Sequence, residues 1–324
     1  MKCTSKRIFS LLCVCIFLTG CGQTKYSLPY TADSNISSFS MVNFEKNPET
    51  AESFASKLCV VDSDIDVDSV NFETGTGAGL FDVNQKDTIF AKNIHETVYP
   101  ASLTKIMTAI VAMKNGSSDM ILTASSNCKI KDPDAQIIKL SEGDTMTLDQ
   151  ALHILLIYSA NDVAIMIAEG IGGSVENFVA MMNEEALKLG CTKTHFTNPN
   201  GLTEDDHYST PYDLYLMMNE ATKFEKFNEI IHTPEYQTIY YSASGNEKEI
   251  DIKSTNSYIT NSVSAPSGIT VIGGKTGTTT MAGHCLVLLS RDTKSNPYIG
   301  IVMKSKTKDD LYSYMNQLLS KIGN

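Results

Sequence analysis

The chain has 324 residues, of which 42% are hydrophobic, and its formal net charge is −11. This length is enough for one large domain or two modest domains with a hydrophobic core. The excess of acidic residues argues against nucleic acid or another polyanion as a binding partner.

The first residues predict an export signal followed by a lipid anchor. Three basic residues precede an apolar run of about 12 residues, shorter than the roughly 20 that a membrane-spanning helix needs. The run ends in Leu18–Cys21, which resembles the lipobox of bacterial lipoproteins, where the cysteine is diacylated and becomes the mature N-terminus. Two acyl chains anchor a protein stably, whereas one does not. Residues 1–20 are therefore predicted to be a lipoprotein signal peptide and Cys21 the lipidation site; a plain signal peptide is the alternative.

Residues 21–56 predict a lipidated cysteine followed by a flexible tether. They are polar, with scattered serine, asparagine and charge and no sustained period. A docked arm with irregular structure is the alternative. From Leu58 onward no linker-like break occurs, so residues 57–324 are expected to form one domain.

Apolar periodicity predicts strands at both ends of this domain and helices in its middle. Strands are expected near Gly79–Val83, Thr88–Ala91, Thr270–Gly273, Cys285–Ser290 and Tyr298–Met303. Helices are expected at 102–114, 147–158, 162–170, 174–189, 211–223 and 308–322. This order indicates an α+β domain with one antiparallel sheet, a helical layer and a helical lobe.

The string Ser102-Leu103-Thr104-Lys105 stands at the start of a predicted apolar helix. Free backbone N–H groups and the dipole at a helix N-terminus favour a developing negative charge, and Lys105 follows one turn later on the same face. Alone, the string also fits a serine cap beside a surface lysine. Two further copies of S-x-x-K, Ser126–Lys129 and Ser305–Lys308, lie in polar, charge-flanked stretches, and we interpret both as coincidences.

The string Ser159-Ala160-Asn161 falls where two predicted helices meet. Thr147–Gln150 has the pattern of a capping box before the first helix, and the second helix begins at Asp162. Polar groups between two apolar helices need hydrogen-bond partners. The residues leave two interpretations open: a hydrogen-bonded turn, or a hydroxyl and an amide that project into a cleft.

The string Lys275-Thr276-Gly277 follows the β-branched run Ile269–Ile272 and two glycines. A strand edge of this kind can hydrogen-bond an extended peptide as an added strand. The lysine and threonine could hold a terminal carboxylate. A glycine-rich turn between strands is the alternative, although such turns seldom carry this lysine.

Cysteine and histidine usage predicts neither a metal site nor a cofactor. Outside the signal and Cys21, four cysteines remain: Cys59, Cys128, Cys191 and Cys285. Export permits disulfides and four cysteines allow three full pairings, but buried free thiols are expected for most of them. The six histidines show no ligand spacing and no C-x-x-C occurs. Gly75–Gly79 lacks the G-x-G-x-x-G pattern and a following helix, so no nucleotide site is expected.

Together the three strings resemble those of the serine D-alanyl-D-alanine carboxypeptidases, the low-molecular-mass penicillin-binding proteins. The similarity extends to neighbouring blocks: Tyr99–Ala109, Phe196–Leu202, Tyr208–Leu214, Gly273–Thr279 and Ala282-Gly283. It covers roughly residues 58–322 in one continuous order. The resemblance implies a β-lactamase/transpeptidase-like fold, with a five-stranded antiparallel sheet flanked by helices and a mostly helical lobe. The last helix ends at the chain end, so the second domain and C-terminal membrane helix of many relatives are expected to be missing.

The resemblance also implies a role for each matching residue. Ser102 would be the acylated nucleophile and Lys105 its base. Ser159 and Asn161 would relay protons and bind the substrate amide. The expected substrate-binding residues are Lys275, Thr276, Gly277 and Thr278. The backbone N–H groups of Ser102 and Thr278 would form the oxyanion hole.

Two groups of lysines are expected to shape the charge of the site. For Lys105 to act as a base near neutral pH, burial or a neighbouring cation must lower its pKa, and Lys275 is the candidate neighbour. Lys304 and Lys306, at the predicted exit of the next strand, are expected to add positive potential near the substrate carboxylate.

We therefore expect a lipid-anchored enzyme on the outer side of a bacterial cell membrane, facing the cell wall. Its domain 57–324 would remove the terminal D-alanine from peptidoglycan stem peptides through a serine acyl-enzyme and would bind β-lactams such as penicillin. The sequence leaves open the stem-peptide type, the balance with endopeptidase or transpeptidase activity, and the oligomeric state.

Two other functions are compatible with parts of the sequence. A class A β-lactamase adds a glutamate that activates water for deacylation, and it usually has Ser-Asp-Asn in place of Ser159–Asn161. The nearest approach to its glutamate block is Glu184–Lys188, within a predicted helix. A non-catalytic cell-wall-binding lipoprotein on a retained fold is the second alternative.

Overall fold

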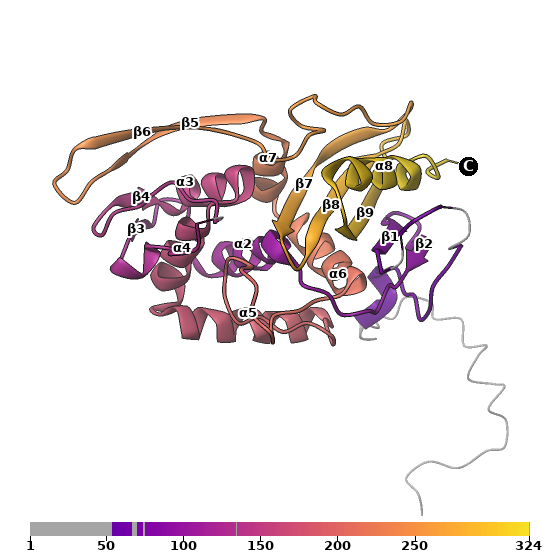
Figure 1. Cartoon of the computed structure of the whole chain (residues 1–324), viewed down its shortest axis with the longest axis horizontal. Helices are drawn as coiled ribbons and strands as arrows, with labels where there is room; N and C mark the ends of the chain where they lie inside the picture. Colours follow the sequence, from indigo (N-terminus) through magenta and orange to yellow (C-terminus); the bar gives the residue numbers. More distant parts are fainter. Residues whose placement is uncertain (1–53, 67–69, 74, 134, 324) are drawn as a thin grey trace, which may run out of the picture. The chain divides into compact units, whose positions relative to one another are not determined.

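The computed structural model describes residues 54–66, 70–73, 75–133 and 135–323 (Figure 1). The chain divides into two units, Met1–Ser53 and Phe54–Asn324, and the description concerns the second unit. The predicted signal peptide, Cys21 and nearly all of the predicted tether lie outside the described residues. The described part begins with a short 3-10 helix, η2 (Phe54–Lys57).

A five-stranded antiparallel sheet organises the domain, as predicted. Its strand order is β2-β1-β9-β8-β7. The strands are β1 (Gly77–Asp82), β2 (Asp87–Lys92), β7 (Thr270–Thr279), β8 (Gly283–Arg291) and β9 (Pro297–Ser305). β7 lies at the sheet edge and extends well past Gly273, so that Lys275-Thr276-Gly277 lies inside an edge strand rather than after one.

The predicted helices are also present, with small shifts of their ends. They are α2 (Lys105–Asn115), α3 (Leu148–His153), α4 (Asn161–Gly172), α5 (Val175–Leu189), α6 (Pro211–Ala221) and α8 (Lys308–Leu319). Thr147 and Gln150 form the expected capping box at the start of α3. Gly173 and Gly190, with φ of 76° and 86°, end α4 and α5 in the left-handed conformation that glycine adopts without strain.

Two features were not predicted from the sequence. α7 (Glu225–His232) is a short helix that follows α6. A second sheet, of order β3-β4-β5-β6, contains β3 (Ile121–Thr123), β4 (Thr145–Thr147), β5 (Glu235–Tyr241) and β6 (Glu247–Lys253). β5 and β6 form the long hairpin of Figure 1, and a single residue pair, Thr145 with Tyr241, joins it to β4.

The five-stranded sheet has a hydrophobic cluster on each face because successive side chains of a strand point to opposite sides. On one face Leu80 and Leu286 pack with residues of α8 such as Met315. On the other face Phe81 and Val287 belong to the cluster formed by α2, α4 and α6. The sheet is therefore the middle layer of three.

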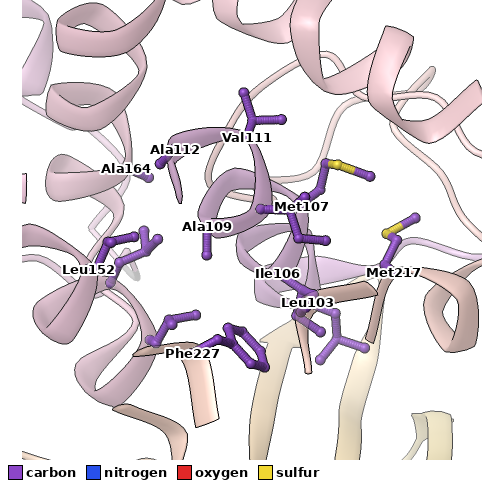
Figure 2. Packing of buried hydrophobic residues seen from close by; sticks show 14 of the residues in the cluster. Leu103, Ile106, Met107, Ala109, Val111, Ala112, Leu152, Ala164, Met217 and Phe227 are labelled. Carbon is purple, nitrogen blue, oxygen red and sulfur yellow. The ribbon is translucent and has the colours of Figure 1, made fainter. Parts of the chain in front are cut away.

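Helix α2 is the centre of the larger cluster. Its residues from Ile106 to Ala112 are buried, and Figure 2 shows apolar side chains from neighbouring segments around the helix. Leu152, Met217 and Phe227 reach it from three other segments of the chain. A helix whose first eight residues are all buried is held there by its surroundings, and this fixes the position of the residues at its N-terminus.

The four cysteines of the domain, Cys59, Cys128, Cys191 and Cys285, are buried free thiols, as expected for most of them. Burial raises the pKa of Cys285 to about 12, so this thiol stays protonated near neutral pH.

Within the described ranges no three His, Cys, Asp or Glu side chains gather in a group that could hold a metal ion. No single helix of the described part is both long and apolar enough to cross a membrane. Of its helix pairs, only α4 and α5 together have the length and composition of a span, and they are bent by 85° relative to each other.

Candidate active site

Ser102 and Lys105 lie side by side at the N-terminal end of the buried helix. Ser102 belongs to a 3-10 turn, η4 (Ala101–Thr104), which leads without a break into α2. The α-helix thus starts three residues later than predicted, and the serine lies in its tighter first turn. Lys105 is fully buried, and its Nζ donates a hydrogen bond of 2.9 Å to Ser102 Oγ.

Lys105 donates to two further acceptors, neither of which is charged. Its Nζ lies 2.8 Å from Asn161 Oδ1 and 2.6 Å from the backbone carbonyl of Asn200. Burial lowers the pKa of Lys105 well below its ordinary value, the charge of Lys275 lowers it further, and Asp162 opposes both. A lowered pKa favours loss of one Nζ proton, and the lone pair left on the nitrogen would face the hydroxyl of Ser102.

Ser159 and Asn161 form a rigid corner between two helices. A π-helical segment, η6 (Ile154–Tyr158), continues α3 and ends at Ser159, whose φ is 70°. α4 then begins at Asn161. Ser159 Oγ accepts a 2.9 Å hydrogen bond from Lys275 Nζ, and Ser159 and Asn161 both line a cleft. Of the two interpretations that the sequence left open, the structure therefore favours groups that project into a cleft.

The residues of the third string divide between the surface and the back of the cleft. Thr276, Gly277 and Thr278 line the cleft from the edge of β7. Lys275 is fully buried, and its Nζ reaches Ser159 Oγ and the carbonyl of Thr276, both at 2.9 Å. Burial lowers the pKa of Lys275 to about 7.

Gly277 allows the strand to approach the serine closely. A Cβ atom at this position would lie 3.0 Å from the backbone nitrogen of Ser102, closer than ordinary packing allows. The backbone of β7 is therefore in direct contact with the backbone of η4, which holds Ser102 and is called the nucleophile turn below.

The cleft has a volume of about 740 Å³ and contains residues that sequence reasoning missed. Thr255, His284, Lys308 and Tyr312 all line it. Thr255 Oγ1 lies 2.6 Å from Thr276 Oγ1. Lys308 is the lysine of an S-x-x-K copy that we interpreted as a coincidence, and its position at the start of α8 gives no sequence signal of a cleft.

Lys304 and Lys306, which were expected to add positive potential near the substrate carboxylate, do not line this cleft. Lys306 is exposed and pairs with Glu73 at 2.9 Å. Lys304 lines a separate cavity. Lys304 lies near the end of β9 and Lys306 just after it, whereas Lys308, which lines the cleft, begins α8.

The loop Asn198–Gly201 packs closely against the backbone of the nucleophile turn. Gly201 has a φ of 85°, and a Cβ there would collide with the carbonyl of Ala101. Its N–H donates to Asn198 Oδ1 at 2.7 Å, which closes the loop. The loop thereby aims the carbonyl of Asn200 at Lys105.

His207 joins this loop to the nucleophile turn and was also missed. Its Nδ1 accepts a hydrogen bond from the backbone N–H of Thr197 at 3.1 Å, so the ring proton is on Nε2, which donates to Thr104 Oγ1 at 2.8 Å. Burial, and then the charges of His195 and Lys105, lower the pKa of His207 to about 4. The signal in the sequence was its place directly before the Tyr208–Leu214 block.

The two glutamates considered as a β-lactamase base lie elsewhere. Glu184 pairs with Lys188 at 2.8 Å and Glu185 with Lys114 at 2.7 Å, and neither lines the cleft. Both lie in α5, as their amphipathic pattern predicted. No glutamate occurs among the described residues that line the cleft.

The antiparallel sheet with a serine and a buried lysine at its edge defines a transpeptidase-type α+β domain. Within that class, the chain belongs to the peptidase S11 family, D-alanyl-D-alanine carboxypeptidase, whose model matches residues 73–307.

Similar proteins of this family come from several bacteria. The chain is 32% identical over 244 residues to the D-alanyl-D-alanine carboxypeptidase DacF of Bacillus subtilis, covering 72% of this chain and 59% of that protein. It is 30% identical over 251 residues to DacC of Escherichia coli, covering 74% and 59%. The chain thus spans about three-fifths of the length of these two relatives.

One solved structure is similar to this chain over nearly the whole length of that structure. The crystal structure of the Streptomyces K15 DD-transpeptidase has a TM-score of 0.70 and 27% identity, covering 76% of this chain and 95% of that one. The D-alanyl-D-alanine carboxypeptidase of Streptomyces strain K15 is 31% identical over 212 residues, covering 62% of this chain and 70% of that protein. The predicted family and fold are therefore confirmed.

The buried neutral His207 predicts a pH-dependent contribution to stability. Since its pKa is lowered to about 4 from an ordinary 6.5, the unfolded chain binds a proton that the folded chain does not. The free energy of unfolding should therefore fall as pH drops from about 6.5 to 4, by up to about 3 kcal/mol at 1.36 kcal/mol per pKa unit. Urea unfolding of wild type and His207→Gln at pH 7 and pH 4.5 measures how much His207 contributes to this pH dependence.

Between pH 7 and pH 4.5, the free energy of unfolding of wild type should fall by about 1–3 kcal/mol more than that of His207→Gln. His195→Gln is the control, because His195 is more exposed and lies outside the cleft. Equal pH dependence in wild type and His207→Gln would contradict the prediction.

Proposed function

We propose that this protein is a serine D-alanyl-D-alanine carboxypeptidase, which removes the terminal D-alanine from peptidoglycan stem peptides and is inhibited by penicillin. One observation carries the proposal. The buried amine of Lys105, with its lowered pKa, lies 2.9 Å from the hydroxyl of Ser102 at the wall of an open cleft. Family membership supports the choice of substrate.

In the first step Lys105 takes the proton of Ser102 as the serine oxygen attacks the carbonyl between the two D-alanines. The negative charge that develops on the carbonyl oxygen faces the backbone N–H groups of Ser102 and Thr278. Fixed donors of this kind stabilise a tetrahedral intermediate by several kcal/mol.

In the second step the peptide bond breaks and the leaving amine needs a proton. Ser159 Oγ already accepts a hydrogen bond from Lys275, so its own hydroxyl proton is free to point at the leaving nitrogen. Ser159 thereby relays the proton from the lysines to D-alanine, while Asn161 holds Lys105 and offers its amide N–H to the substrate. Water then attacks the ester on Ser102 and restores the free enzyme.

The terminal carboxylate of the substrate binds at the middle of β7. The hydroxyl of Thr276 lines the cleft there, and Lys275 lies directly behind it. Lys308 contributes a further positive charge from the start of α8. In this assignment Thr276 contacts the carboxylate, and Lys275 acts through Ser159 and its electrostatic potential.

The nucleophile assignment predicts one penicilloyl group on Ser102. Purified residues 22–324 incubated with fluorescent penicillin should give a labelled band, which Ser102→Ala abolishes. Lys105→Ala should slow acylation by about 10²–10⁴-fold, the usual contribution of a general base. The adduct should persist for minutes, since no glutamate among the described cleft residues activates water against it.

Ser126→Ala is the matched control, because Ser126 belongs to another S-x-x-K string and lies outside the cleft. An adduct on Ser126 or Ser305 by mass spectrometry would contradict the assignment. Rapid multiple turnover of a chromogenic cephalosporin would support the β-lactamase alternative, and the absence of any acylation would support the non-catalytic one.

The carboxylate assignment predicts a preference for a free peptide end. A charge-assisted hydrogen bond from Thr276, strengthened by nearby lysines, is lost when the terminal carboxylate is an amide. Wild type should therefore hydrolyse the amidated substrate with a kcat/KM at least 10-fold lower, or about 1.4 kcal/mol. Thr276→Val should narrow this gap by slowing hydrolysis of the free acid. Equal hydrolysis of both substrates by wild type would favour an endopeptidase.

We also propose that the protein is anchored outside the cytoplasmic membrane by lipid on Cys21, facing the cell wall. The lipobox-like Leu18–Cys21 and the polar residues after it support this. The sequence also supports a domain order of signal peptide, tether and catalytic domain, with bounds at residues 20 and 56. The stem peptides of the wall would then lie within reach of a tethered domain.

The anchor predicts the behaviour of a single variant. Wild-type protein should partition into membranes or detergent, whereas Cys21→Ala should remain an unprocessed precursor or be released. Cys15→Ala is the control, because it lies in the same apolar run but outside the lipobox. Normal processing and membrane retention of Cys21→Ala, seen by fractionation and gel mobility, would remove the basis for the anchor.

A further inference from the structure

Asp162 is a buried carboxylate beside the active site that no step of the proposed mechanism uses. It directly follows Asn161 in the first turn of α4, and 0% of its surface is exposed. Its Oδ1 accepts a 3.0 Å hydrogen bond from the backbone N–H of Val163 in the same helix. A buried carboxylate is costly unless its oxygens are hydrogen-bonded, so the position of Asp162 is explained by the donors around it.

The other donors to Asp162 come from a loop, residues 135–140. Its Oδ2 accepts hydrogen bonds from the backbone N–H groups of Ile138 at 3.1 Å and Leu140 at 3.0 Å. Between these two donors, Lys139 has a φ of 64°, in the left-handed region. A backbone turn of this kind directs neighbouring N–H groups toward one anion. The 135–140 loop is therefore folded around the carboxylate, and the carboxylate holds the loop on the start of α4.

The same loop supports the corner that carries Ser159. The backbone carbonyl of Gln136 accepts a 2.8 Å hydrogen bond from the N–H of Asn161, and its side-chain amide donates to the carbonyl of Tyr158. Ser159 lies between these two contacts with a φ of 70°, a conformation that persists only where the surroundings enforce it. Ala135 and Gln136 also line the cleft. The loop is thus both a wall of the cleft and the support of a strained corner.

Asp162 also acts on Lys105 through its charge. The charge of Lys275, on β7, lowers the pKa of Lys105, whereas the charge of Asp162, on α4, raises it. His207 is a third titratable group near Lys105, and since its own pKa is lowered to about 4 it is mostly neutral above pH 5. Burial raises the pKa of Asp162 itself, and its backbone N–H donors oppose that rise. Of these groups, Asp162 is the one that favours the ammonium form of Lys105.

We propose that Asp162 is a positioning residue for the acylation of Ser102, which holds the 135–140 loop on the Ser159 corner and acts on Lys105 through its negative charge. It does not line the cleft, so both effects pass through other residues. This role rests on the proposed function, because acylation of Ser102 is the reaction concerned.

The test measures the second-order rate constant for acylation of the purified protein by penicillin, from pH 5 to pH 8. Asp162→Asn nearly keeps the shape of the side chain but removes its charge and one acceptor. At pH 8 the variant should react at least about 10-fold more slowly, because a small displacement of a catalytic group is costly. Trypsin should also cleave it faster after Lys139, an exposed residue in a loop that has lost its anchor.

The pH profile is a readout that a purely structural role would not move. Lys105 must be neutral to take the proton of Ser102, so acylation slows as pH falls and the amine gains a proton. Because the charge of Asp162 favours that protonated form, Asp162→Asn should move this fall in rate to lower pH. At pH 5 the variant should keep a fraction of its own pH 8 rate that is at least about threefold larger than the fraction that wild type keeps.

Asp213→Asn is the matched control. Asp213 is also a buried carboxylate in the first turn of a helix, α6, and it accepts a 2.9 Å hydrogen bond from the backbone N–H of Lys193. It lies outside the cleft, so its replacement should leave the acylation rate and the pH profile close to those of wild type. Thermal unfolding of both variants verifies that they are folded.

A second variant tests the loop without changing a buried charge. Gln136→Leu removes the amide that donates to the carbonyl of Tyr158. It should slow acylation at pH 8 and leave the pH profile where it is in wild type. If Asp162→Asn does not fold, a wild-type rate in Gln136→Leu contradicts the role of the loop.

The outcomes separate this role from the function on which it rests. A wild-type acylation rate and pH profile in Asp162→Asn would overturn the role of Asp162, and so would equal changes in Asp213→Asn. Either result leaves the proposed function intact as long as penicillin labels Ser102 in wild type. If penicillin labels no residue of wild type, the proposed function and the role of Asp162 in acylation are both refuted.

Discussion

Two lysines buried beside each other without a carboxylate ligand are the constraint on which the site depends. Lys105 comes from the central helix and Lys275 from the edge strand, and both are bound by neutral oxygens. An ammonium ion buried in this way is costly, so burial lowers the pKa of both amines. Their acceptors, Asn161, Asn200 and Ser159, bring the helical layer, the loop and the sheet edge together around Lys105.

The fold maintains unfavourable local geometry to place these groups. Ala101, directly before Ser102, has a φ of 48°, and Ser159, at the corner between η6 and α4, has a φ of 70°. Such conformations cost on the order of 1–3 kcal/mol each and persist only where the surroundings enforce them. Here α2 is packed on all sides, and glycine at 201 and 277 lets backbones approach the nucleophile turn closely. Precision at the site is therefore a property of the core.

Hydrophobic periodicity predicted the elements that build this core. The five strands of the main sheet and six helices were predicted because their apolar residues repeat with the period of a strand or a helix. The second sheet was missed because β3 and β4 have three residues each and β6 is rich in charge. α7 was missed because only Phe227, Ile230 and Ile231 are buried in its eight residues. These elements form only because tertiary neighbours cover one of their faces.

The sequence by itself determined the family, the order of the three strings and the pairing of Ser102 with Lys105, because residues three apart at a helix start must be neighbours. Only the tertiary structure decided that Lys275 lies behind Ser159, that Lys308 rather than Lys304 or Lys306 reaches the cleft, and that His207 joins two loops. Those partners are separated by many residues along the chain. Their distances are set by how layers pack around α2, which no local pattern encodes.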